Sequence, residues 1–153
     1  MRKILATVAT LGLAGLGVLV PTTSVQAASE NCNMEWHGSM SGHFYAYDGA
    51  NCVYILGHTA SWDSDWGNSS GPFQGGDTND ARAILHKGTS GLAVQVFNGT
   101  GQDWAGGHTC IKKSEKYMSD LDGFTFTSGA SVSNGISSHR WVDEDRCGRF
   151  LDS

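Results

Sequence analysis

The feature that most constrains this chain is an internal repeat, in which residues 44–60 recur at 94–110, fifty positions later. Gly49 aligns with Gly99, and the tripeptide Gly-His-Thr at 57–59 aligns with the same tripeptide at 107–109. Those are four identities where chance gives about one. A unit of about 50 residues holds four short strands, the content of one Greek key. Two such units packed face to face give an eight-stranded sandwich with one shared core.

The local pattern agrees with an all-β fold. Aromatic and β-branched residues alternate with others at 44–47, 94–97 and 124–127, so each segment is predicted to be a strand. Nothing after the leader sustains a helical stripe for three turns, although 112–120 could form one short turn of helix. We therefore expect two Greek-key repeats, at 43–90 and 91–142, flanked by tails at 28–42 and 143–153.

The first residues have the form of a secretory signal. Arg2 and Lys3 precede a run at 4–20 without charge, and small residues before Ala28 favour cleavage after Ala27. A membrane anchor is the alternative, but the run is short for a span. Cleavage leaves 8 basic against 15 acidic residues, a net charge of −7. The mature chain is thus predicted to be extracellular, with neither nucleic acid nor, after signal cleavage, a membrane as its partner.

Four cysteines in an exported chain indicate two disulfides, for which three connectivities exist. Cys32 and Cys147 lie near the ends of the mature chain, and Cys52 and Cys110 lie inside the two halves. We favour Cys32–Cys52 and Cys110–Cys147, because each bond then ties a tail to its nearer half.

The repeats resemble the βγ-crystallin Greek key. The residues that carry the likeness are the strand aromatics, the Gly-rich turns, the Trp-Ala-Gly sequence at 104–106 and a late polar element at 79–84 and 133–138. The segments at 64–68 and 134–142 are similar to secreted proteins of the Streptomyces metalloproteinase inhibitor family. This resemblance implies a βγ-crystallin-like sandwich and an inhibitor of metallopeptidases.

The same resemblance implies calcium, since paired Asn/Asp-Asn/Asp-x-x-Ser/Thr-Ser loops supply hard oxygen ligands. Aligning 79–84 with 133–138 makes the candidate ligands Asn79, Asp80, Ser133, Asn134 and Ser137. Both loops are degenerate, because Ala83 lacks a hydroxyl and Ser133 replaces a leading Asn or Asp. We expect no required cofactor and at most weak calcium binding; the alternative is that these polar residues only close turns.

No catalytic constellation is evident, so we expect no enzyme. The sequence at 67–71 fits the Gly-x-Ser-x-Gly pattern of serine hydrolases, but Pro72 and two later glycines cannot open the helix that this motif needs. The histidines show no His-Glu-x-x-His motif and are expected to be structural.

Tryptophans mark a candidate recognition loop. Trp62, Asp63, Asp65 and Trp66 lie in a polar stretch at 61–76 without strand alternation, so we expect this loop at the surface. The alternative is that both tryptophans fold back onto the sandwich. Trp104 and Trp141 occupy repeat positions of hydrophobic anchors and are predicted to be core.

These observations support two functions. The first is inhibition of a thermolysin-like metallopeptidase by one rigid exposed loop, in which disulfides limit the entropy lost on binding. The alternative is a carbohydrate- or cell-envelope-binding module, or an antimicrobial protein, that uses Trp62 and Trp66 on a polysaccharide.

Overall fold

The computed structural model describes residues 25–152, and most of the predicted signal peptide, residues 1–24, lies outside them. One helix and seven strands occupy the described part: α1 (Val25–Gly38), β1 (Phe44–Gly49), β2 (Val53–Thr59), β3 (Ala83–His86), β4 (Ala93–Phe97), β5 (His108–Ile111), β6 (Tyr117–Met118) and β7 (Ser138–Val142). Short 3-10 turns join them at Ala50–Cys52, Gly75–Asp77, Thr100–Gln102, Lys113–Glu115 and Glu144–Arg146.

The strands form two antiparallel sheets, one in the order β2-β1-β3-β6 and the other in the order β5-β4-β7. Each sheet also pairs with a segment from the other half of the chain. β6 joins the first sheet by pairing with β3, and Asp63 forms an isolated bridge with His139 of β7 in the second sheet. This exchange fastens the two halves to each other and gives them one core.

The repeat is visible in the backbone. The turns at Ala50–Cys52 and Thr100–Gln102 lie fifty residues apart, and their central residues, Asn51 and Gly101, share a φ of 69°. Asn51 adopts this left-handed conformation despite its side chain, which asparagine tolerates better than most residues. The Asn51 N–H donates to Ser119 O at 2.6 Å, which ties this turn to the second half of the chain.

The main core lies between the sheets. Phe44, Val94 and Ile111 belong to it, with large side chains from the connecting loops such as Trp66 and Phe126. These side chains bury nearly all of their surface, so their removal from water is the main source of stability.

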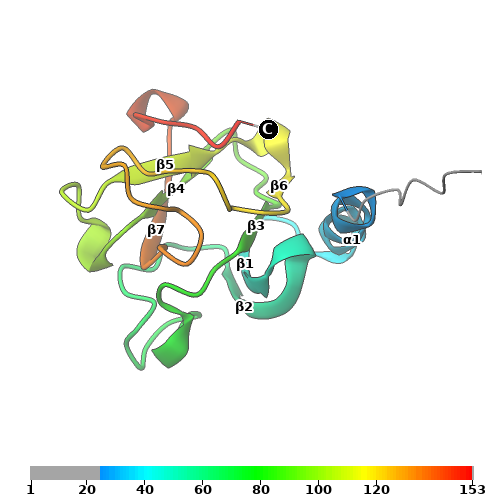
Figure 1. The fold of residues 1–153 in the computed structure, drawn as a ribbon, viewed down its shortest axis with the longest axis horizontal. Helices are drawn as coiled ribbons and strands as arrows, with labels where there is room; N and C mark the ends of the chain where they lie inside the picture. Colours follow the sequence, from blue (N-terminus) through cyan, green and yellow to red (C-terminus); the bar gives the residue numbers. More distant parts are fainter. Residues whose placement is uncertain (1–24, 153) are drawn as a thin grey trace, which may run out of the picture.

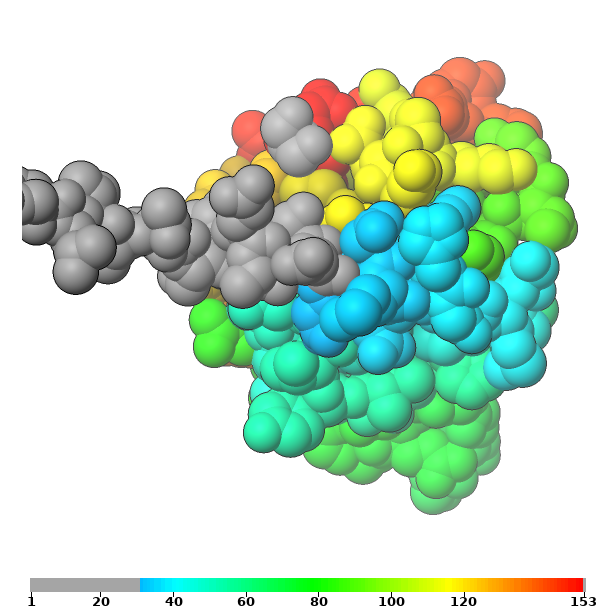
Figure 2. Space-filling model, turned by 90° about the vertical axis from the view of Figure 1, so that its right-hand side faces the viewer, coloured from blue at the N-terminus to red at the C-terminus, as the bar shows by residue number. Residues whose placement is uncertain are grey.

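The outer face of each sheet is covered by one end of the chain. α1 lies over the first sheet, where Tyr45, Tyr47 and Leu85 form a small cluster with the Cys32–Cys52 disulfide. Figure 1 shows α1 beside this sheet, and Figure 2 shows it lying across the surface between the segment near residue 120 and the β2 region. The C-terminal segment covers the second sheet in the same way, around Cys110–Cys147.

Both predicted disulfides are confirmed, and they span 20 and 37 residues. Because disulfides persist in oxidising compartments, they indicate an extracellular protein. Within residues 25–152, no helical segment has the length and apolar character that a membrane crossing requires.

Three details of the prediction were wrong. The predicted tail at 28–42 contains most of α1, a helix that the sequence pattern did not reveal. The predicted strand at 124–127 is an irregular loop in which Thr125 makes a single bridge to Ser131. The sandwich accordingly has seven strands instead of eight in the described residues. The strands at 44–47 and 94–97 and the short turn within 112–120 are confirmed.

Candidate binding site

The predicted recognition loop, 61–76, is fixed to the sandwich by two buried rings. Trp66 and Phe73 are fully buried and stack with their ring centroids 4.1 Å apart. The Trp66 Nε1–H donates to His139 Nδ1 at 2.9 Å. Trp66 therefore does not lie at the surface and follows the alternative, in which the tryptophan folds back onto the sandwich. Phe73 of the same loop stacks on its ring, and His139 of β7 accepts its N–H.

The two aspartates of the loop hold its backbone. Asp63 is buried, and its carboxylate accepts hydrogen bonds from the N–H groups of Asp65, at 3.0 Å, and Phe73, at 3.4 Å. Asp65 Oδ1 accepts a hydrogen bond from the Gly67 N–H at 2.9 Å. Such short-range bonds stabilise turns. Among the four residues predicted for binding, Trp62 is the one whose side chain is free for a partner.

Trp62 borders an open pocket. Trp62 is 60% exposed, and the pocket has a volume of about 580 Å³. Trp141, Arg140 and Gln102 also line this pocket. The Trp141 Nε1–H donates to Ser61 O at 2.9 Å. This bond holds Ser61, the residue before Trp62, against β7. We call this the Trp62 pocket.

Arg140 is held in place beside a further exposed indole. Its Nε–H donates to Gln95 Oε1 at 2.9 Å, and its guanidinium carbon lies 5.2 Å from the Phe97 ring centroid and 5.5 Å from that of Trp104. Trp104 is 54% exposed, so the prediction that it belongs to the core is wrong. Trp141, also predicted as core, packs against the core but still lines the pocket.

Sequence reasoning missed Gln102, Arg140 and the exposure of Trp104. The turn at Thr100–Gln102 brings Gln102 to β7, where its N–H donates to Ser138 Oγ at 3.2 Å. The exposure of Trp104 could have been inferred from the sequence at 104–106, because a tryptophan followed by Ala and Gly fits a turn better than a core strand. The role of Arg140 could not be predicted from the local sequence, because the position of its side chain depends on the pairing of β7 with β4.

The two candidate calcium loops pair through their backbones. The Asn79 N–H donates to Ile136 O at 2.8 Å, and the Asn134 N–H donates to Ala81 O at 2.9 Å. Both asparagines have a left-handed φ, 58° and 54°. By these reciprocal bonds Asn79 is structurally equivalent to Asn134, 55 positions later. The sequence alignment paired Asn79 with Ser133, 54 positions later, so it was shifted by one residue.

The corrected alignment makes calcium a poor fit. Arg82 becomes the equivalent of Ser137, because their N–H groups donate to the matching carbonyls of Tyr47 and Phe97. A guanidinium thus stands where the motif needs a hydroxyl, and it pairs with Asp122 at 3.3 Å. The Ser137 Oγ–H donates to Asn79 Oδ1 at 2.8 Å, so these two candidate ligands already bind each other.

We expect calcium to bind these loops weakly, with a dissociation constant in the millimolar range. A few millimolar calcium should then raise the free energy of unfolding by at most about 1 kcal/mol. Arg82→Ser removes the cation and restores the hydroxyl, so it should increase the effect. Thermal unfolding with calcium or with chelator measures both. A large stabilisation of the unaltered protein by micromolar calcium would contradict this expectation.

Other metal sites find no support within residues 25–152, where no three His, Cys, Asp or Glu side chains gather as possible ligands. His108 supports the C-terminal segment, because its Nε2 accepts a hydrogen bond from the Gly148 N–H at 3.2 Å. Burial lowers the pKa of His108, with the charge of Arg140 adding to the effect.

No protein-family model and no curated protein matches this chain. A solved structure described as "Evolution of the eye lens beta-gamma-crystallin domain fold" aligns with it at a TM-score of 0.51. The alignment covers 69% of this chain and 89% of that chain at 13% sequence identity, a level that shows the fold alone. The likeness to the metalloproteinase inhibitor family stays a prediction. Two antiparallel sheets, connected through β6 and through the Asp63–His139 bridge, together with this match, show that the chain has the βγ-crystallin domain fold.

Proposed function

We propose that this extracellular protein acts by binding, without catalysis, and that its ligand is a carbohydrate held in the Trp62 pocket. The observation that carries the proposal is the exposed Trp62 indole beside Trp141, Arg140 and Gln102. Exposed indoles stack against the C–H faces of sugar rings and exclude water there. The guanidinium and amide N–H groups can donate hydrogen bonds to sugar hydroxyls.

The size and rigidity of the pocket support this ligand class. Its volume of about 580 Å³ lies within the usual range for small-ligand sites. Trp141 and Arg140 are already fixed by hydrogen bonds to Ser61 and Gln95. Less side-chain entropy is therefore lost when a ligand binds.

Trp62→Ala should weaken polysaccharide binding by about tenfold or more, because it removes the largest exposed apolar surface of the pocket. The free energy of unfolding should change by less than about 1 kcal/mol, since the side chain is mostly exposed. Co-sedimentation with insoluble chitin, cellulose and peptidoglycan, together with urea unfolding, measures both effects.

Tyr54→Ala is the matched control. Tyr54 is an aromatic residue that is 78% exposed on β2, at the edge of the other sheet. Its removal should leave polysaccharide binding unchanged. Failure of the unaltered protein to bind all three polymers, or equal binding by Trp62→Ala, would refute the proposal.

Inhibition of a metallopeptidase is the second candidate, and a different part of the loop favours it. Residues 67–72 are exposed, and they connect Trp66 to Phe73, whose rings stack in the core. The Gly75 N–H donates to Asn68 O at 3.1 Å, and the Ser70 N–H donates to Asn68 Oδ1. An exposed segment closed in this way could enter a protease cleft with little loss of entropy.

A thermolysin assay with the mature protein tests this second function. If 67–72 is the inhibitory segment, Ser69→Pro should reduce inhibition by about tenfold or more, because it changes the backbone that the cleft would meet. Trp62→Ala should inhibit as well as the unaltered protein. Absence of inhibition at a large excess of protein over thermolysin would rule out this candidate for thermolysin-like enzymes.

A further inference from the structure

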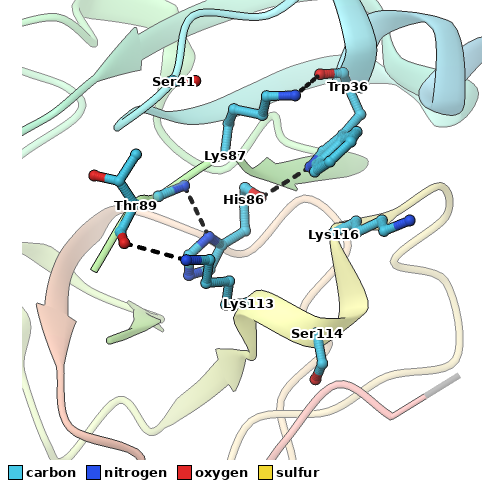
Figure 3. Close-up of a pocket in the computed structure, with 9 residues that line it drawn as sticks. Trp36, Ser41, His86, Lys87, Thr89, Lys113, Ser114 and Lys116 are labelled. Atoms are coloured by element: carbon cyan, nitrogen blue, oxygen red, sulfur yellow. Dashed lines mark hydrogen bonds between the residues drawn. The ribbon is translucent and has the colours of Figure 1, made fainter. Parts of the chain in front are cut away.

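A second pocket, of about 690 Å³, lies where α1 meets the first sheet. Three separate parts of the chain form it: α1 with the loop after it, the end of β3 with the residues after it, and residues 113–116. The residues that determine its character are Trp36, His86, Lys87, Thr89, Lys113 and Lys116. Figure 3 shows the three lysines arranged around Trp36 and His86.

The pocket concentrates positive charge on an acidic protein. Three of the eight basic residues in the predicted mature chain line it. The ion pairs between described residues are Arg82–Asp122 and Lys112–Asp152, and neither involves these three lysines. Lys87 donates to Trp36 O at 2.6 Å and Lys113 donates to Thr89 O at 3.1 Å. Both acceptors are neutral carbonyls, so neither hydrogen bond offsets the charge of the ammonium group that donates it.

Two of these lysines lie against the Trp36 ring. The ammonium nitrogens of Lys87 and Lys116 lie 3.4 and 5.0 Å from the centroid of the Trp36 ring. The ring is itself fixed, because its Nε1–H donates to His86 O at 3.2 Å. A cation over an indole face is stabilised by the ring quadrupole. Two long side chains are thereby ordered before any ligand arrives.

His86 lines the pocket as a neutral imidazole. Its Nδ1 accepts a hydrogen bond from the Gly88 N–H at 3.1 Å, which leaves Nε2 to donate to Leu92 O at 2.9 Å. Burial lowers the pKa of His86, and the charge of Lys113 acts in the same direction. The positive charge of the pocket therefore comes from the lysines.

We infer that this second pocket binds an anionic group, either a phosphate or a carboxylate. Each lysine ammonium has three N–H donors, and the two carbonyl contacts use one each on Lys87 and Lys113. The remaining donors can make charge-assisted hydrogen bonds to anionic oxygens, which are stronger than bonds between neutral groups. The site is separate from the Trp62 pocket and does not depend on the carbohydrate proposal.

The anion could be free or part of an acidic polymer, and two probes distinguish these sources. Inorganic pyrophosphate represents a free anion, and trigalacturonic acid represents a carboxylate on a sugar chain. Both are titrated into the ¹⁵N-labelled mature protein at low ionic strength. We expect amide shifts at Gly88, Thr89 and Ser114 with at least one probe. The affinity should fall by about tenfold or more as salt screens the lysines.

The double substitution Lys113→Gln with Lys116→Gln should weaken binding by about tenfold or more. Both side chains are exposed on the rim, so the fold should be retained. Lys112→Gln is the control, since it removes the same charge one residue away from the pocket lining. Trp62→Ala should also leave anion binding unchanged. Shifts with neither probe, or equal affinity in the double variant, would overturn the inference.

Discussion

Trp66→Ala is expected to lower the free energy of unfolding by about 3–5 kcal/mol, the range for truncating a buried aromatic side chain. The indole is fully buried, stacks on Phe73 and donates a hydrogen bond to His139. Alanine would leave a cavity between the sheets and an unpaired acceptor at His139 Nδ1. Urea unfolding of the mature protein measures the loss.

Two further variants separate the causes. Trp66→Phe keeps an aromatic ring but loses the N–H, so it should cost less than alanine. Trp62→Ala, four positions away in the same loop, should change the unfolding free energy by less than about 1 kcal/mol. If the Trp62 and Trp66 substitutions were equally mild, Trp66 would not be part of the core.

Acidification is expected to produce the second large effect, through His139. The ring is fully buried, and burial lowers its pKa to about 3, although the hydrogen bond to Ser61 O opposes this shift. Its Nδ1 accepts the Trp66 hydrogen bond, so the folded protein holds the neutral imidazole. An unfolded histidine has a pKa near 6.5.

The unfolded chain therefore binds one more proton than the folded protein between pH of about 6.5 and 3. The stability due to neutral His139 is complete above the unfolded pKa and is lost as the pH falls toward the folded pKa. The free energy of unfolding should decrease by about 1.4 kcal/mol per pH unit from this residue. Burial lowers the pKa values of His86 and His108 as well, so they act in the same direction.

Urea unfolding between pH 7 and 5 tests this slope, because most carboxylates remain ionised over that range. His139→Gln can still accept from Trp66 and donate to Ser61, and it should flatten the slope. An NMR titration of the His139 ring in the unaltered protein is an independent measurement. Protonation of that ring near pH 6 in the folded state would contradict the expectation.

The site divides into parts that the sequence could and could not predict. The loop at 61–76 was identified because its polar residues interrupt the strand pattern. Whether Trp62 or Trp66 is the exposed one could not be read from that pattern, since the partner of Trp66, His139, lies 73 residues later. Arg140 and Trp104 meet only because β7 pairs with β4, so no local signal joined them.

Helix α1 could not be predicted from the local sequence either. α1 has no long apolar stripe, and it is held by the Cys32–Cys52 disulfide and by the contact of Trp36 with His86. Each of these needs a second segment of the chain. Because α1 is held over the first sheet, β1 is buried on both faces, at Phe44 on one side and at Tyr45 and Tyr47 on the other. Its sequence alone predicts a strand with one face in solvent.

By itself the sequence determined the two-fold repeat and the all-β sandwich, and it favoured one of the three possible pairings of the four cysteines. The repeat and the fold class follow from spacing along the chain, because a repeated pattern folds into repeated units. The structure then showed that each cysteine pairs within its own half. The tertiary structure alone decided which tryptophans are buried, which residue aligns with Ser137, and where the lysines gather. Those outcomes depend on contacts between segments far apart in sequence, and the burial and charge that such contacts create are properties of the packed molecule.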